Sequence, residues 1–291
     1  MGWWGADVYN TVAMQTVAIL GAGELGGAVG RALACRDLVS RIVFIDRSGT
    51  VAAGKALDIR QSGPVEGFDT RLDGTEDLSS VIGASVVVLA DEHGAGDWTG
   101  EAALQLLGRV HAYNPRALIV AAGARQRDVL RLAVTELGLP PTRVVGSAPT
   151  AAAGAARALV ALEAGCSATD VSLSVVGAPP GWVIAWADGS VAGSPLVRAL
   201  APPAVTRIEA RLRASWPAGP HALASAAAAV IHAAWTGSHR QFSCFVGDLR
   251  EPRRSTFVAL PVVLGPAGVR RVDVPQLAPR EQVALDALLR P

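Results

Sequence analysis

The first half of the chain alternates short apolar runs, rich in β-branched residues, with segments of helical length. Apolar runs without polar interruption are typical of strands buried on both faces of a parallel sheet that helices cover. The expected strands are residues 17–20, 42–45, 86–89, 118–121 and 143–145, and the expected helices are residues 24–36, 51–61, 98–113 and 125–137. This half therefore predicts an α/β fold with a doubly wound parallel sheet.

The second half has a different order, with strands grouped with strands and helices with helices. Such grouping favours an α+β domain. The expected elements are a helix at 150–165, strands at 171–176 and 182–186, helices at 195–214 and 221–235, strands at 242–246, 257–264 and 269–272, and a last helix at 279–289. We place the boundary at residue 147, giving domains 1–147 and 148–291. Residues 1–14 form an extra arm, whose Trp3 and Trp4 are expected to pack on the body or on a neighbouring subunit.

Charge and cysteine content exclude several classes of protein. Among the 291 residues, 26 are Lys or Arg and 25 are Asp or Glu, with no basic run, which argues against a nucleic-acid partner or an anionic membrane. No apolar run is long enough to span a membrane. Cys35, Cys166 and Cys244 lie far apart, which predicts reduced thiols in a cytoplasmic protein and neither a disulfide framework nor a metal site.

A glycine pattern, Gly21-Ala-Gly23-Glu24-Leu25-Gly26, directly follows the first expected strand and opens the first expected helix. In a dinucleotide-binding turn the first glycine permits the tight turn, the second admits a pyrophosphate, and the third lets the helix pack on the strand. The free N–H groups at the helix N-terminus then attract the phosphates. The pattern predicts a Rossmann-type domain that binds a dinucleotide.

An acidic residue, Asp46, ends the second expected strand 20 residues after Gly26. A carboxylate there can bind both ribose hydroxyls and repels a 2′-phosphate, so the expected cofactor is NAD, although the neighbouring Arg47 leaves room for NADP. The alternative is a glycine-rich strand–helix turn that binds nothing.

With these marks in place, the chain resembles the lactate/malate dehydrogenase family along nearly its whole length. The resemblance rests on GAGELGGAVG (21–30), GKALD (54–58), LGLPPTRVVG (137–146), the helix at 221–234 and ALPVVLGPAGVRRV (259–272). It implies an NAD-binding Rossmann domain, an α+β substrate domain and a homodimer or homotetramer. It also places Ala90, after the fourth strand, beside the cofactor.

The departures from that family concern its catalytic groups. The family's acid–base His falls near Pro179 or Pro180, and neither proline can transfer a proton. Its partner Asp falls at Ala152 and its carboxylate-binding Arg at Ala155. Arg157 is kept as a candidate, although two residues further along a helix turn it by about 200°.

Two further family features are replaced. The Asn-Pro after the fifth strand becomes Ala-Gly-Ala at 122–124. The loop after the fourth strand, which carries two arginines in the family, reads ADEHGAGDW at 90–98 and is acidic. An acidic loop would repel a 2-hydroxy or 2-oxo acid.

Several residues could take over the missing roles. Asp91 and His93, two residues apart at the ligand-binding edge of the sheet, could form a new acid–base pair, or could belong to a polar solvent loop. Trp98 could close over a nicotinamide or pack against its own helix. Arg125 and Arg127 could hold an anionic substrate or lie on the surface.

The sequence supports two functions of different class. The first is an NAD-dependent oxidoreductase of CH–OH donors, in carboxylic acid metabolism, with an altered substrate. The second, which we favour, is a pseudoenzyme: a catalytically inactive family member that acts as an NAD(H)-binding sensor or a structural partner.

Overall fold

The computed structural model describes residues 15–179, 181–247, 249 and 256–289. The expectation for Trp3 and Trp4 lies outside these residues. Among the described helices, none is both long and apolar enough to cross a membrane.

The described residues of the first half form a parallel sheet, as predicted, but with six strands in place of the five expected. Their order is β3-β2-β1-β4-β7-β8, and β1 pairs with β2 on one side and with β4 on the other. The strands are β1 (Thr16–Leu20), β2 (Arg41–Ile45), β3 (Arg71–Thr75), β4 (Val86–Leu89), β7 (Leu118–Ala121) and β8 (Val144–Gly146). The order reverses between β1 and β4, and ligands of such sheets bind beside that point, at the carboxyl ends of the strands.

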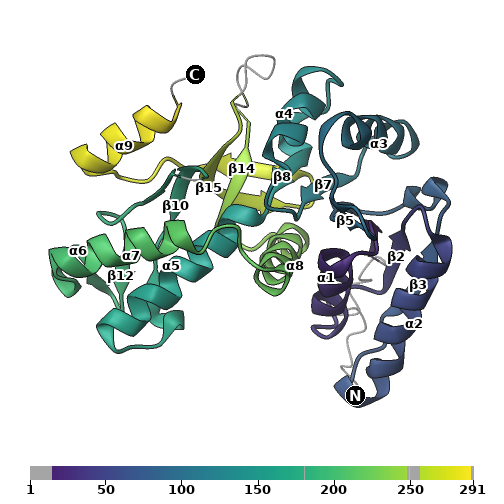
Figure 1. The fold of residues 1–291 in the computed structure, drawn as a ribbon, viewed down its shortest axis with the longest axis horizontal. Helices are drawn as coiled ribbons and strands as arrows, with labels where there is room; N and C mark the ends of the chain where they lie inside the picture. Colours follow the sequence, from purple (N-terminus) through teal and green to yellow (C-terminus); the bar gives the residue numbers. More distant parts are fainter. Residues whose placement is uncertain (1–14, 180, 248, 250–255, 290–291) are drawn as a thin grey trace, which may run out of the picture.

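Helices on both faces cover this sheet, and 3₁₀ turns complete its connections. In Figure 1, strands β7 and β8 lie between α3 and α4 on one side and α1 and α8 (Pro220–Thr236), a helix of the second half, on the other. The elements are α1 (Glu24–Ala34), α2 (Gly49–Glu66), α3 (Gly100–Tyr113), α4 (Arg127–Thr135), η1 (Leu78–Val81) and η2 (Pro141–Arg143). The prediction of a Rossmann-type α/β half is confirmed.

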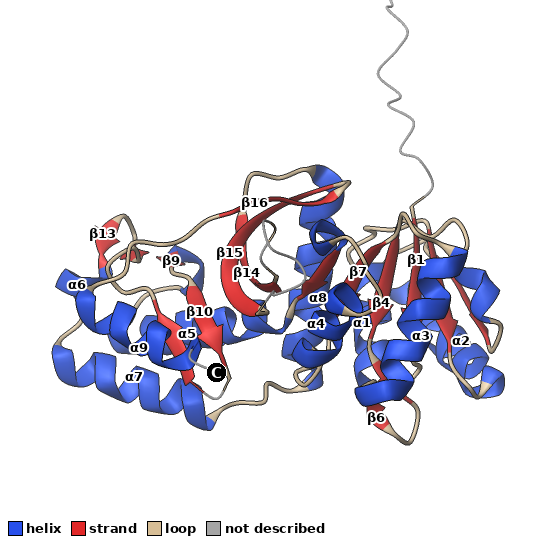
Figure 2. Ribbon diagram, turned by 90° about the horizontal axis from the view of Figure 1, so that it is seen from above, coloured by secondary structure: helices blue, strands red, loops and turns tan. Residues whose placement is uncertain are grey.

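The second half continues the same sheet with antiparallel strands. Strand β14 pairs with β8 through Phe245 and Gly146, so the sheet runs on as β8-β14-β15-β10-β11, with β16 beside β15. Figure 2 shows β1, β4 and β7 toward one end, β10 toward the other, and β14 and β15 between them. These strands are β10 (Val175–Ala178), β11 (Gly181–Ile184), β14 (Gln241–Val246), β15 (Val258–Gly265) and β16 (Gly268–Val272).

Helices and a small second sheet complete this α+β region. Helix α8 packs against both α1 of the first half and α5, and so joins the two halves. The helices are α5 (Ala148–Ala164), α6 (Leu196–Ala199), α7 (Pro202–Ala214), α8 (Pro220–Thr236) and α9 (Pro279–Leu289), with η3 at Ala168–Asp170. The small sheet contains β9 (Val171–Ser172), β12 (Ser190–Val191) and β13 (Ser194–Pro195).

Two expectations about individual elements are wrong, and one strand was not expected. The strand expected at 171–176 is split into β9 and β10, which belong to different sheets. The helix expected at 195–214 breaks between α6 and α7, because Pro202 and Pro203 disfavour a continuous helix through the residues before them. Strand β3 was not expected, since at this sheet edge Leu72 is its only buried residue.

Candidate functional site

The turn between β1 and α1 has the backbone shape that its glycine pattern predicts. Gly21 has a φ of +109°, a conformation that residues with a Cβ rarely adopt. A Cβ at Gly26 would collide with the carbonyl oxygen of Gly21, so this glycine lets α1 pack against the end of β1. The first and third glycines are thus explained by the backbone alone.

The N-terminus of α1 is occupied by a carboxylate of the chain itself. Asp91 Oδ1 accepts a hydrogen bond from the Gly26 N–H at 2.7 Å, and Oδ2 accepts one from the Leu25 N–H at 3.1 Å. The Gly23 N–H donates to the carbonyl oxygen of Asp91 at 3.1 Å. A Cβ at Gly23 would collide with the Asp91 carboxylate. The second glycine of the pattern therefore makes room for Asp91.

Asp46, the residue expected to bind a ribose, is also engaged by the backbone. Its side chain is buried, with Asp46 4% exposed. Oδ2 accepts hydrogen bonds from the N–H groups of Ala22 at 2.8 Å and His93 at 3.1 Å, and Oδ1 accepts one from Ser48 at 3.1 Å. Three backbone donors thus hold this carboxylate against the loop after β4.

That loop folds into a short hairpin of β5 (Asp91–Glu92) and β6 (Gly96–Asp97), which we call the Asp91 hairpin. Glu92 forms an ion pair with Arg47 at 2.8 Å. The Arg47 guanidinium also lies 5.3 Å from the centre of the Trp98 ring, and Trp98 is buried at the end of the hairpin. The segment for which a polar solvent loop was one of the two interpretations is therefore held in place at both of its ends.

A buried glutamine, which the sequence analysis did not single out, supports the base of the hairpin. Gln126 is 1% exposed; its Nε2 donates to the Ala90 carbonyl at 2.7 Å, and its Oε1 accepts from the Gly123 N–H at 2.8 Å. The side-chain amide thus links the ends of β4 and β7. Its place three residues after Gly123 is the signal that could have identified it.

Asp97, on the second strand of the hairpin, accepts a weak hydrogen bond from the Arg125 N–H at 3.3 Å. Burial raises the pKa of Asp97, and the neighbouring Asp91 carboxylate raises it further, against the lowering effect of Arg125. The hairpin therefore places two carboxylates near each other in a partly buried position.

The structure does not bring the proposed acid–base pair together. Within the described residues, no hydrogen bond or ion pair joins the side chains of Asp91 and His93; the Asp91 carboxylate faces α1, whereas His93 is exposed. Arg125 is exposed, and Arg127 pairs with its neighbour Asp128 at 3.3 Å. These residues stay candidates without a shared site.

A dinucleotide does not fit this arrangement of residues. Its pyrophosphate needs the N–H groups at the start of α1, and its ribose needs the free carboxylate at the end of β2. In this structure the N–H groups at the start of α1 already donate to Asp91. The Asp46 carboxylate already accepts hydrogen bonds from the N–H groups of Ala22, Ser48 and His93. The candidate cofactor residues Gly21, Gly23, Glu24, Leu25, Gly26, Asp46 and Ala90 do lie together, but around the Asp91 hairpin.

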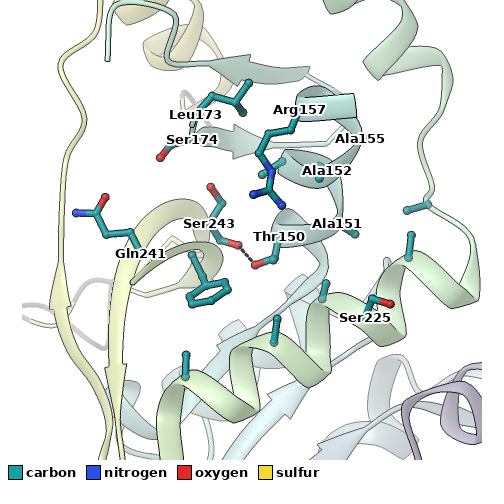
Figure 3. A pocket seen from close by; sticks show the side chains of 18 of the residues that line it. Thr150, Ala151, Ala152, Ala155, Arg157, Leu173, Ser174, Ser225, Gln241 and Ser243 are labelled. Carbon is teal, nitrogen blue, oxygen red and sulfur yellow. Dashed lines mark hydrogen bonds between the residues drawn. The ribbon is translucent and has the colours of Figure 1, made fainter. Parts of the chain in front are cut away.

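A cavity of about 780 Å³ lies in the second half, between α5, α8 and the start of β14. Figure 3 shows Ala151, Ala152 and Ala155 of α5 along its wall, with the Thr150 hydroxyl donating to the Ser243 carbonyl at 2.7 Å. Its lining includes Arg36, Arg157, Arg240 and His232 but no Asp or Glu. The cavity is therefore wide, lined by small residues and cationic in character.

Arg157 points into this cavity, with its guanidinium on the side of Thr150 and Ser243 (Figure 3). Both Arg157 and Ala155 line the cavity, although they are two residues apart on α5. Within the described part of the chain, no acidic side chain pairs with Arg157. It remains a candidate for binding an anion.

The β10–β11 hairpin carries no side chain that could transfer a proton. Residues 175–184 read VVGAPPGWVI, and Ala178 pairs with Gly181 across the turn. Pro179 is partly buried in this turn, while Pro180 lies outside the described residues.

Neither metal-ion nor thiol chemistry finds support among the residues that the structure describes. No group of three His, Cys, Asp or Glu side chains there could hold a metal ion. Cys35 and Cys166 are partly buried and free; Cys244 is fully buried, and this burial raises its pKa to about 12. A thiol so desolvated stays protonated and is a poor nucleophile.

The fold of this chain is similar to that of lactate and malate dehydrogenases of known structure. A lactate dehydrogenase from Cryptosporidium parvum, solved with lactic acid and nicotinamide adenine dinucleotide, superposes with a TM-score of 0.85 at 22% identity, covering 96% of this chain and 95% of that one. A malate dehydrogenase from Salinibacter ruber gives a TM-score of 0.82 at 24% identity, covering 94% and 93%. No family model matches the chain.

Sequence similarity extends the likeness beyond the fold. A malate dehydrogenase from Thioalkalivibrio sulfidiphilus is 28% identical over 95% of this chain and 96% of its own length. Malate dehydrogenases from Roseiflexus sp. and Thermomicrobium roseum are 31% and 33% identical, but in these alignments the chain spans only about half, 55%, of the relative's length. Over nearly its whole length the chain is therefore similar in sequence to malate dehydrogenases, and its fold is that of lactate and malate dehydrogenases.

Proposed function

We propose that this protein is a catalytically inactive member of the lactate/malate dehydrogenase family. In this proposal it transfers no hydride to or from a 2-hydroxy acid. The observation that carries the proposal is the wall of the cavity in the second half. Where the family resemblance places an Asp and an Arg on α5, Ala152 and Ala155 line open space. Where it places the His, the β10–β11 hairpin has prolines.

The expected loss of rate follows from the chemistry of these groups. Oxidation of an alcohol carbon needs a base for the hydroxyl proton, and a positioned acid–base group contributes about 10²–10⁴ in rate. Losing a charge-assisted contact to a substrate carboxylate costs about 1.5–3 kcal/mol. The effects do not add, because such groups act as a unit. Either loss alone would leave little lactate or malate turnover.

The alternative function is an NAD-dependent dehydrogenase with a different substrate. It is favoured by the similarity to malate dehydrogenases over nearly the whole chain and by the Arg157 guanidinium in the cavity. It requires NAD to bind at the glycine turn and Ala90, with Arg157 binding the acid group. It further requires a proton acceptor, for which Asp91 and His93 are the candidates and would have to move.

The test measures hydride transfer directly. The full chain is incubated with NAD and a panel of 2-hydroxy acids and neutral alcohols, and with NADH and the matching 2-oxo acids. The malate dehydrogenase from Thioalkalivibrio sulfidiphilus serves as the active control under the same conditions. We expect no absorbance change at the NADH wavelength above the enzyme-free rate. Saturable turnover of any member of the panel, lost in an Arg157→Ala variant, would establish the alternative instead.

A further inference from the structure

We propose that Asp91 is an internal anion that takes the place of a dinucleotide's pyrophosphate at the N-terminus of α1, so that the folded chain excludes NAD and NADH. This goes beyond the proposed function, because a catalytically inactive protein can still bind its cofactor. It also departs from the sequence prediction of NAD binding, which rests on the same glycine turn.

The first support is the chemistry of the contact. The opening N–H groups of an α-helix lack partners within the helix and carry its positive dipole end, so they favour an anion. Asp91 supplies one through both carboxylate oxygens, at 2.7 Å to Gly26 and 3.1 Å to Leu25. Charge-assisted hydrogen bonds of this kind are about twice as strong as neutral ones. A pyrophosphate would have to displace them.

The second support is that the glycine pattern is fully used without a nucleotide. A Cβ at Gly21 would collide with the Asp91 carbonyl oxygen, and a Cβ at Gly23 would collide with its carboxylate. Gly26 is needed for the packing of α1 against Gly21. Each glycine that the motif requires for a cofactor is here required by the chain itself.

The third support is that the Asp91 hairpin is tied down along its length. The His93 N–H binds the buried Asp46, Glu92 pairs with Arg47, and Gln126 binds the Ala90 carbonyl. Moving Asp91 outward would break these contacts as well. Moreover, an Asp91 carboxylate displaced by only a short distance would lie near a doubly negative pyrophosphate, and like charges at short range repel.

The experiment compares NADH binding in three forms of the full chain by isothermal titration calorimetry. The wild type should show no saturable binding up to about 1 mM, the upper end of ordinary KM values. Asp91→Ala removes the internal anion and should bind NADH at least tenfold more tightly. Glu92→Gln is the matched control: it removes one negative charge from the same hairpin and only an ion pair with the exposed Arg47, which contributes little to holding the hairpin. The hydrogen bonds of Asp91 to α1 remain, so this variant should bind NADH no better than the wild type.

Thermal unfolding with inorganic pyrophosphate gives a second readout. Asp91→Ala should unfold at a lower temperature than the wild type, because the N–H groups of Leu25 and Gly26 lose their acceptor. Added pyrophosphate should raise the Tm of the variant more than that of the wild type, because only the variant has a free helix N-terminus, whereas binding in the cationic cavity would affect both equally. If Asp91→Ala does not fold, Asp91→Asn replaces it; the amide keeps one acceptor oxygen without the charge, and should show the same gains to a smaller extent.

Two results would overturn the inference. One is saturable NADH binding by the wild type below about 1 mM; without turnover it leaves the proposed function standing, and with turnover it overturns both. The other is a folded Asp91 variant that gains affinity for neither NADH nor pyrophosphate, which would make Asp91 a structural residue only.

Discussion

The two regions that the family resemblance marks as functional differ in this protein: one keeps its sequence motif but is filled by a side chain of the chain, and the other has lost its motif but is open. The turn between β1 and α1 keeps its glycine pattern but is filled by the Asp91 carboxylate. The α5 wall in the second half has lost its expected polar side chains but borders a cavity of about 780 Å³. The glycine motif is retained, but the turn that it forms is occupied by Asp91. The expected polar residues of α5 are absent, and the helix lines an open cavity.

This contrast separates what a motif encodes from what occupies it. Glycines at 21, 23 and 26 specify a backbone that lets another group come close to a helix N-terminus. They do not specify which group comes. In this chain the group is Asp91, which lies 65 residues beyond Gly26 in the sequence.

The largest effect is expected where the turn is filled. Gly23→Ala should lower the free energy of unfolding by about 2 kcal/mol, because the new Cβ would push the Asp91 carboxylate away from the N–H groups of Leu25 and Gly26. In an Asp91→Ala background the same substitution should cost less than about 1 kcal/mol. Urea denaturation of the four proteins of this cycle measures the coupling. Equal costs in both backgrounds would mean that Asp91 does not occupy the turn.

A large side chain should cost little stability where it points into the open cavity and more where it enters the packed core beside it. Ala229→Leu, on the face of α8 that lines the cavity, should change the free energy of unfolding by less than about 1 kcal/mol. Ala228→Leu, one residue earlier and fully buried, should cost about 1–3 kcal/mol by overpacking. Chemical denaturation compares the two, and similar costs would contradict an open cavity beside Ala229.

A third substitution repeats the glycine test in the open region. Nothing lies within 4 Å of a Cβ built on Gly154, in the middle of α5. Gly154→Ala should therefore raise the free energy of unfolding by about 0.5–1 kcal/mol, the gain that alanine gives over glycine inside a helix. The same change thus has opposite signs in the two regions. A loss of stability at Gly154 would remove that contrast.

The smallest effect concerns the charge of the hairpin. Since burial and Asp91 raise the pKa of Asp97, the folded state disfavours its ionised form, and the resulting destabilisation grows as pH rises through that pKa. Asp97→Asn should therefore stabilise the protein at pH 7, with the gain fading as pH falls below about 4, where the unfolded carboxyl is protonated. Thermal melts across this range check the sign. A gain that persists at low pH would point to packing and not to charge.

Most of the fold could be predicted from the sequence, because buried parallel strands are continuous apolar runs. Strands β2, β4 and β7 begin and end within one residue of the expected positions. The strand β3, RLDGT, was missed because an exposed edge leaves a single buried leucine as its signal. The break between α6 and α7 was missed although Pro202 and Pro203 mark it.

The site could be predicted only in part. Local spacing identified the glycine turn and Asp46, and both lie at the expected edge of the sheet. That Asp91 fills this turn depends on a contact between segments far apart in the chain and on the closure of a seven-residue hairpin, which no local pattern encodes. The hydrogen bond from the Gln126 side chain to the Ala90 carbonyl likewise joins residues 36 positions apart in the chain.

A crystal structure of the wild-type chain grown with a large excess of NADH would show whether Asp91 or a dinucleotide occupies the start of α1. We expect the Asp91 carboxylate on the N–H groups of Leu25 and Gly26, and no pyrophosphate at the start of α1. A dinucleotide in that position, with the Asp91 hairpin moved aside, would contradict this expectation.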